Sequence, residues 1–134
     1  KKEHERTRHY IKEMETKTPS IKQLCKNLSG GNQQKVVIGK WLCRNADIMI
    51  FDEPTVGVDV GAKAEIYKLI EQLTRQGKCI ILISSYLPEI MGLADEMMVI
   101  SEGKLMGTLD RSEFMKDGKL DEERALRLAS GISE

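Results

Sequence analysis

A strand–helix–strand pattern in the middle of the chain constrains its fold more than any other feature. The run "DIMIFDEP" places four apolar residues at 48–51 before two acids and Pro54. Apolar residues then recur at helical spacing over 66–73 and stop at Gly77, and "CIILISS" forms a second apolar run at 79–85. Short continuous apolar runs are typical of strands that are buried on both faces of a parallel sheet. Because consecutive parallel strands need a right-handed crossover, the pattern predicts an α/β fold with a parallel core and flanking helices.

The segments before this unit are predicted to be helical. We expect a polar helix over 4–16, and a short second helix with Ile21 and Leu24 on one side after the turn at Pro19. An amphipathic helix is expected to follow two consecutive glycines and to end near Asn45.

The segments after it mix helix and strand. Pro88 fits the first turn of a brief helix, and "EMMVISEGKLMGTL" predicts a hairpin that turns at Glu102 and lies at the edge of the sheet. The tail predicts two polar helices with Asp110 and Asp121 as N-caps and Gly131 as a stop.

Composition excludes several classes of protein. Basic and acidic residues balance at 21 each, so no net field favours nucleic acid or an anionic membrane, and 4% aromatic residues leave few stacking groups for RNA. No apolar run approaches the roughly 18 residues of a membrane span, and the start lacks the apolar core of a signal peptide. The chain of 134 residues is therefore expected to be one soluble, cytosolic domain.

The cysteines and histidines indicate no metal site. Cys25, Cys43 and Cys79 are widely spaced, which favours scattered buried thiols over a disulfide or a zinc site. His4 and His9 lie in a charged opening segment that is typical of a solvated helix face.

Two short stretches have residue types suited to phosphate chemistry. In "LSGGNQQKV", at 28–36, a serine and two glycines precede a helix-compatible run, so backbone N–H groups could approach an anion closely. Asp52 and Glu53 follow a predicted parallel strand, at the end where ligands collect in such sheets. Such a pair can divide its work between a hydrated Mg²⁺ and a water molecule. Taken singly, the glycines could be a turn before a helix and the acids a loop cap before Pro54.

The order of the motifs is more specific than any one of them. "LSGGNQQKV", "IMIFDEPTVGVD" and "ISSYLPEI" together resemble the second half of the nucleotide-binding domain of ATP-binding cassette (ABC) transporters, with its signature motif, Walker B strand, D-loop and switch segment. The resemblance covers 18–109. With "GVDVGAK" after the strand, the chain is most similar to the carboxyl-terminal cassette of double-cassette ATPases from bacterial ribose- and galactose-type importers.

The resemblance implies a partial P-loop NTPase fold in three parts. Residues 1–27 would end the helical subdomain, 28–109 would carry the signature, Walker B, D-loop and switch segments, and 110–134 would form carboxyl-terminal helices. Missing strands would leave an unpaired edge, so self-association or marginal stability is expected.

The resemblance also implies a role for each candidate residue. The signature, with Ser29, Gly30 and Gly31 and with Gln33 nearby, would contact the γ-phosphate of ATP held by a facing cassette. In the chain's own site, Asp52 would hold Mg²⁺ through water and Glu53 would polarise the attacking water. The D-loop residue Asp59 would couple the two sites, and it also reads as an acid at a helix N-terminus.

Three departures from the family pattern stand out. No G-x-x-x-x-G-K-[ST] occurs, since "SEGKLMGT" lacks the spaced glycine and a hydroxyl residue after Lys104. These 134 residues are therefore read as a carboxyl-terminal fragment and predicted to bind little ATP and to turn none over. Ser85 stands where the switch histidine belongs, which predicts a slow site around Asp52 beside an intact signature, and Val56 replaces an arginine of the sugar-importer pattern.

The resemblance implies an ATPase, with ATP and Mg²⁺ as its cofactors in the full-length protein. Its partners would be a second cassette, integral membrane permease subunits and, indirectly, a periplasmic or extracellular sugar-binding protein, but no nucleic acid. It would lie in the cytoplasm on the inner face of the membrane. Two alternatives stay open: an interaction or regulatory module without ATP chemistry, and a soluble cassette protein of DNA repair or translation.

Overall fold

The computed structural model describes residues 2–116 and 119–131, and the chain divides into two compact units, Lys1–Ile81 and Leu82–Glu134. Each unit is described by itself. The first contains α1 (Lys2–Glu13), the short 3₁₀ helix η1 (Cys25–Asn27), α2 (Gly30–Leu42), β1 (Ile48–Asp52) and α3 (Val60–Arg75), and β2 (Cys79–Ile83) spans the division. The second contains α4 (Leu87–Leu93), β3 (Glu96–Ser101), β4 (Lys104–Asp110), α5 (Arg111–Phe114), β5 (Met115–Lys116), β6 (Lys119–Leu120) and α6 (Glu123–Ala129).

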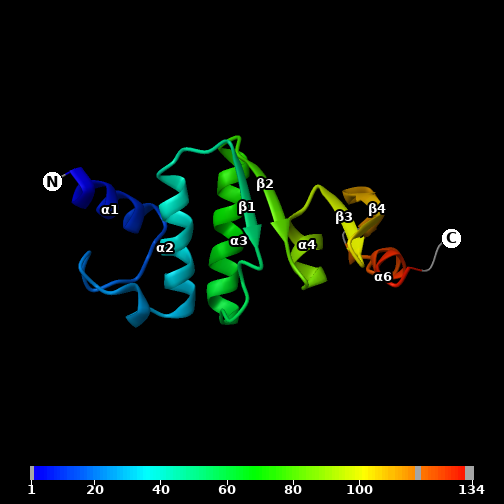
Figure 1. The fold of residues 1–134 in the computed structure, drawn as a ribbon, viewed down its shortest axis with the longest axis horizontal. Helices are drawn as coiled ribbons and strands as arrows, with labels where there is room; N and C mark the ends of the chain where they lie inside the picture. The colour runs from blue at the N-terminus through cyan, green and yellow to red at the C-terminus, as the bar shows by residue number, and fades with distance from the viewer. Residues whose placement is uncertain (1, 117–118, 132–134) are drawn as a thin grey trace. The chain divides into compact units, whose positions relative to one another are not determined.

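The predicted strand–helix–strand unit is confirmed. Strands β1 and β2 pair in one sheet, α3 connects them, and their arrows point the same way in Figure 1.

The glycine stop after α3 is also confirmed. Gly77 adopts a left-handed φ of 84°, its N–H donates to the Thr74 carbonyl (2.9 Å), and the Lys78 N–H donates to the Leu73 carbonyl (3.0 Å). This pair of bonds is a Schellman motif, which satisfies the last carbonyls of the helix.

The prediction that both strands are buried on two faces is wrong. On β1, Met49 and Phe51 are buried, whereas Ile48 and Ile50 are 62% and 66% exposed. On β2, exposed and half-buried residues alternate. Within the described part of the chain, only one face of β1 is covered, so a continuous apolar run takes the alternating pattern of a half-buried sheet.

The amino-terminal segment differs from the expectation in two ways. Helix α1 ends before Thr16 because Glu15 adopts a left-handed φ of 48°, and the Thr16 N–H donates back to the Ile11 carbonyl (2.9 Å). The helix predicted around 20–24 is absent, since turns and then η1 occupy residues 17–28 of this described segment. The Ser20 hydroxyl accepts from the Lys22 N–H (3.2 Å), a local bond that competes with helix formation.

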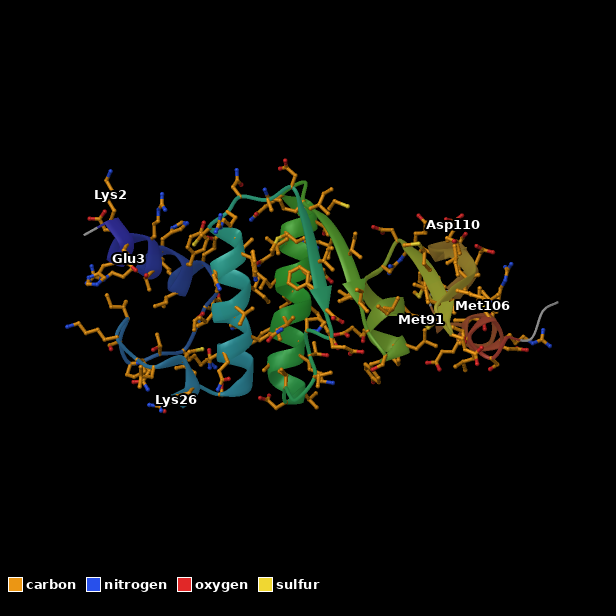
Figure 2. The ribbon with its side chains drawn as sticks, in the orientation of Figure 1. Lys2, Glu3, Lys26, Met91, Met106 and Asp110 are labelled. Carbon is orange, nitrogen blue, oxygen red and sulfur yellow. The ribbon has the colours of Figure 1, made fainter. Side chains whose placement is uncertain are left out.

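In the second unit the predicted hairpin is confirmed. It forms a two-stranded sheet of its own and does not lie at the edge of the β1–β2 sheet, as the sequence predicted. Strands β3 and β4 are antiparallel, and the turn uses positive φ at Glu102 and Gly103. One face covers a small core that includes Met91, with Met106 packed against it (Figure 2). The buried members of this core are Met91, Met97, Val99, Leu109, Phe114 and Ala125.

The tail is helical in part. Asp110 caps α5 in a reciprocal capping box with Glu113, as predicted. The α6 helix takes Glu122 as its N-cap instead of Asp121, although the Asp121 carboxylate accepts from the Glu123 N–H (3.3 Å). Gly131 follows α6 with a φ of 69°.

Two further observations concern exposure. The three cysteines are free and exposed, so the prediction of buried thiols is wrong. Cys79 is exposed because it begins β2, and the face of β2 on which it lies is not covered by other described residues of the first unit. No helix among the described residues has the length and apolar character needed to cross a lipid bilayer.

Candidate functional site

The serine–glycine motif forms the first turn of α2. Ser29 is the N-cap residue, with extended backbone (φ −62°, ψ 156°), and its carbonyl accepts from the Gln33 N–H (2.8 Å). As the structure describes this turn, the Ser29 side chain caps none of the helix N–H groups. Ser29 and Gly30 are exposed. The motif therefore presents a hydroxyl and the positive end of a helix at the surface.

Close packing within the first unit requires glycine at position 31 and leaves little room at position 30. A Cβ at Gly31 would lie 2.4 Å from the Ala62 Cβ on α3, and a Cβ at Gly30 would lie 3.2 Å from the Gly57 carbonyl oxygen. The first distance is far below van der Waals contact. The structure thus brings the first turn of α2 against the loop before α3 and against the first turn of α3, which Figure 1 shows beside it.

Two polar side chains fix the chain around this turn. The Asn32 amide donates to the Ser29 hydroxyl (2.8 Å), and its carbonyl oxygen accepts from the Lys17 N–H (2.7 Å). The Gln33 amide donates to the Leu28 carbonyl (2.8 Å), so this side chain folds back on the segment before the helix. Asn32 was missed by the sequence reasoning, although its place three residues after an N-cap serine is where a capping partner is expected.

Asp59 lies on the same loop and is the N-cap of α3. Its carboxylate accepts from the Ala62 N–H (3.0 Å) and its carbonyl from the Lys63 N–H (2.9 Å). The predicted acid at a helix N-terminus is therefore present, three residues before the alanine that contacts Gly31.

This cap gives a stability prediction. Asp59→Ala removes the acceptor for the Ala62 N–H, so we expect the free energy of unfolding to fall by about 1 kcal/mol. Asp59→Asn is the matched control, because asparagine caps as well as aspartate but carries no charge. Denaturant titration of the full-length protein measures both. If Asp59→Asn lowered the free energy of unfolding as much as Asp59→Ala does, the capping role would be contradicted and the effect would be assigned to charge.

The acid pair ends β1 and begins the next turn. Asp52 is the last, exposed residue of the strand, and Glu53 follows it with a left-handed φ of 47°. The Glu53 carbonyl accepts from the Val56 N–H (3.2 Å), and Pro54 and Thr55 are buried behind it. Glu15 and Glu102 have a similar left-handed φ, so the conformation of Glu53 reflects the turn that it begins.

An ion pair between a buried lysine and a half-exposed glutamate joins α2 and α3, and the sequence reasoning missed it. The Lys35 side chain is 5% exposed, and its Nζ lies 2.7 Å from the Glu65 carboxylate. The same Nζ donates to the Glu15 carbonyl (3.3 Å). The hydrogen bond and the charge of Lys35 hold the pKa of Glu65 below its usual value, so the pair is intact near neutral pH.

Ser85 belongs to the second unit, where it lies exposed in the bend after β2. The neighbouring Ser84 hydroxyl accepts from the Tyr86 N–H (3.0 Å), which shapes this bend before α4. The other candidate residues all lie in the first unit, where the first turn of α2 packs on the loop before α3 and the acid pair ends β1.

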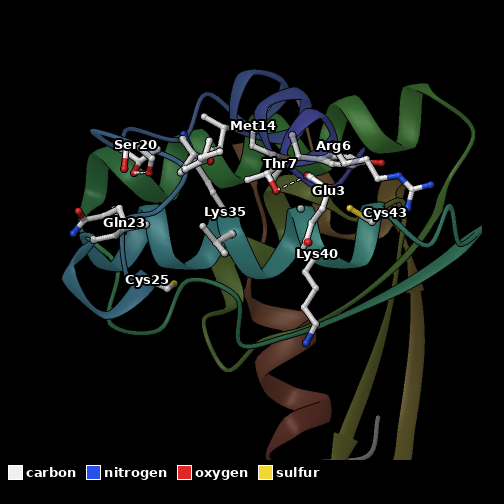
Figure 3. A pocket seen from close by; sticks show the side chains of 18 of the residues that line it. Glu3, Arg6, Thr7, Met14, Ser20, Gln23, Cys25, Lys35, Lys40 and Cys43 are labelled. Atoms are coloured by element: carbon white, nitrogen blue, oxygen red, sulfur yellow. Dashed lines mark hydrogen bonds between the residues drawn. The ribbon is translucent and has the colours of Figure 1, made fainter. Parts of the chain in front are cut away.

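The described residues of the first unit include the linings of a larger and a smaller cavity. The larger, about 510 Å³, opens between α1, the segment before α2, and α2, and Figure 3 shows Met14 and Lys35 among its lining side chains. The smaller, about 340 Å³, lies beside the exposed face of β1 and includes Asp52. Of the predicted site residues, Asp52 lines the smaller of these two cavities.

Comparisons with known proteins decide the family. Residues 1–56 match the family described as ABC transporter. The ribose import ATP-binding protein RbsA of Clostridium perfringens strain SM101 is 50% identical over 93% of this chain and 24% of its own length. The chain belongs to the ABC transporter family. The putative ribose/galactose/methyl galactoside import ATP-binding protein of Geobacillus kaustophilus is 53% identical over 89% of this ABC chain and 22% of its own. The xylose import ATP-binding protein XylG of Thermoanaerobacter pseudethanolicus is 51% identical over 91% of this chain and 23% of its own length.

Solved ABC cassettes have the same fold. The dimeric bacterial cassette MJ0796 matches with a TM-score of 0.70 and 22% identity, over 82% of this chain and 47% of that one. The ADP conformation of the cassette MJ1267 matches with a TM-score of 0.75 and 21% identity, over 95% of this chain and 49% of that one. The partial P-loop NTPase fold expected from the motifs is thereby confirmed. The chain spans about a quarter of the length of its curated relatives, 22% to 24% in these three.

Proposed function

We propose that the protein is the ATP-hydrolysing subunit of a monosaccharide importer, and that these residues supply the signature, Walker B, D-loop and switch segments of its second cassette. The observation that carries the proposal is the exposed first turn of α2, packed on the Asp59 loop, in a chain half identical to sugar-import ATP-binding proteins. The division into a helical-subdomain end (1–27), a catalytic part (28–109) and carboxyl-terminal helices (110–134) is part of the same proposal.

In this proposal the signature acts on ATP held by a facing cassette. The Ser29 hydroxyl and the N–H groups of the first turn of α2 donate to the γ-phosphate, where they stabilise negative charge. Gly30 leaves this surface open, since it carries no side chain and is exposed. Gln33 contributes through its bond to the Leu28 carbonyl, which fixes the segment that enters the helix.

The acid pair serves the nucleotide site of this cassette itself. No cluster of three or more metal-ligating side chains occurs within residues 2–116 and 119–131. Mg²⁺ that accompanies a nucleotide needs only one or two carboxylates beside phosphate and water, so Asp52, exposed at the strand end, fits it. The ion would neutralise phosphate charge when bound. Glu53 would then orient and deprotonate the attacking water.

Ser85 makes the two sites of the transporter unequal. A serine hydroxyl is shorter than an imidazole and uncharged, so it does not replace the contact that a switch histidine makes with the γ-phosphate. The site of Asp52 and Glu53 then mainly binds nucleotide. The intact signature completes the competent site of the partner cassette.

This asymmetry predicts a gain of function. We expect Ser85→His to raise steady-state ATP hydrolysis by the full-length protein about twofold, because a second site then contributes. Adding Glu53→Gln to Ser85→His should remove the gain, whereas Glu53→Gln in the otherwise unchanged protein should have little effect. A strong loss with Glu53→Gln alone would show that the site with Ser85 is already active.

The proposal also places the protein in a complex. It would lie in the cytoplasm on the inner face of the membrane, bound to a second cassette and to permease subunits, with a sugar-binding protein acting from the other side. The dimeric state of a solved cassette of the same fold supports the pairing.

The full-length protein tests the proposal directly. We expect Mg²⁺-dependent ATP hydrolysis and recovery of integral membrane subunits when the protein is purified from membranes in mild detergent. Hydrolysis without membrane subunits would favour a soluble cassette protein. Membrane or protein partners without nucleotide binding, measured by titration calorimetry, would favour an interaction module.

A further inference from the structure

Lys35 and Gly31 lie on the same face of α2. They are four residues apart, which places one above the other on a helix. Their partners on α3, Ala62 and Glu65, are three residues apart and share a face in the same way. Two of the contacts between these helices therefore follow one another along this face, the close packing of Gly31 on Ala62 and then the Lys35–Glu65 ion pair.

The Lys35 ammonium joins three segments. Its Nζ lies 2.7 Å from the Glu65 carboxylate on α3 and 3.3 Å from the Glu15 carbonyl at the end of α1. The side chain is 5% exposed, whereas Glu65 is 43% exposed. A buried lysine carries a desolvation cost that a methionine would not, so burial of this charge is a poor way to gain stability. The directional bonds of the Lys35 ammonium to Glu65 and to the Glu15 carbonyl explain better than stability why a charged group lies here.

We propose that Lys35 is a positioning residue whose ion pair with Glu65 sets the direction in which the first turn of α2 presents Ser29 and its N–H groups. The Gly31 contact with Ala62 fixes how closely the helices approach at their first turns. The ion pair, one turn further along α2, adds a second, directional restraint on the same face. The same α3 begins at Asp59, so the direction of the signature turn is tied to that of the D-loop.

The inference rests on the proposed function, because the signature turn matters only if it acts on a nucleotide. Lys35→Met in the full-length protein keeps the length and burial of the side chain and leaves Glu65 accessible to water. We expect kcat for ATP hydrolysis to fall about tenfold, since small displacements of donors have large effects on rate. The KM for ATP and the melting temperature should stay close to those of the unchanged protein.

A second readout does not depend on hydrolysis. Amide hydrogen exchange at residues 33–35 of the nucleotide-free protein, where the hydrogen-bonded part of α2 begins, should be faster in Lys35→Met, because the helix has lost a contact with α3 near its start. Lys35→Arg retains the charge and should restore both kcat and exchange protection. Glu71→Gln, which breaks the exposed pair of Glu71 with Arg75 on α3, is the matched control and should change neither quantity.

The outcomes separate this inference from the proposed function. A purely structural role for Lys35 predicts a lower melting temperature with kcat unchanged per folded molecule, and that result would overturn the inference alone. Gly30→Asp is the reference variant for the signature. If it leaves hydrolysis unchanged, or if the unchanged protein hydrolyses no ATP, the proposed function fails and this inference with it.

Discussion

Gly30→Asp is expected to lower ATP hydrolysis by the full-length protein about a hundredfold, the scale seen when a donor to a developing negative charge is lost. Gly30 is exposed in the first turn of α2, beside Ser29, where the proposed function places the γ-phosphate of a facing nucleotide. A carboxylate there would repel the phosphate and compete for the N–H groups of the turn.

Gly30→Asn is the matched control for this variant, because asparagine has the same shape without the charge. Its Cβ meets the Gly57 carbonyl oxygen at the same 3.2 Å, so the steric cost is equal in the two variants. We expect the Asn variant to retain several times the rate of the Asp variant. Nucleotide binding at the chain's own site, measured by equilibrium titration, should be unchanged in both. Equal loss in the two variants would assign the effect to packing instead of charge.

Gly31→Ala is expected to lower the free energy of unfolding by about 2 kcal/mol, the cost of forcing an extra methyl into a packed contact. The new Cβ would lie 2.4 Å from the Ala62 Cβ, so α2 and α3 must separate. The displacement also moves Ser29 away from the Asp59 loop, and ATP hydrolysis should fall with the stability.

A compensating variant tests the cause. Gly31→Ala with Ala62→Gly transfers the methyl group from α3 to α2, and we expect it to recover most of the lost stability and rate. Gly92→Ala in α4 serves as the control, because nothing lies within 4 Å of its Cβ position, and it should not lower the free energy of unfolding. If the double variant were as unstable as Gly31→Ala, the contact with Ala62 would not be what requires glycine.

Much of the local structure could be predicted from short stretches of sequence. The stop at Gly77 and the turn at Glu102 and Gly103 depend on backbone conformations that adjacent residues specify. The run at 48–51 correctly predicted a strand, but its burial was wrong, because whether a second face is covered depends on other parts of the fold. The helix expected at 20–24 failed for a local reason, the bonds that Ser20 makes with nearby backbone.

In the candidate site, too, some features could be predicted from neighbouring residues and others depend on distant parts of the chain. The order of the motifs identified Ser29, Gly30 and Gly31, the acid pair and Asp59 as candidates, and the structure has the fold of solved ABC cassettes. Nothing in "LSGGNQQK" indicates that Lys35 is buried, since a lysine in a polar run is usually solvated. Only the position of Glu65, thirty residues further along the chain, shows it.

By itself, the sequence determined the α/β class, the family and the nature of the groups available for phosphate chemistry, because these depend on residue types and on their order. Tertiary structure decided why Gly31 must be glycine, why Lys35 can be buried, and how the first turn of α2 lies against the Asp59 loop. These features are contacts between α2 and α3. Their energies depend on atoms that are distant in sequence and come together only when the two helices pack.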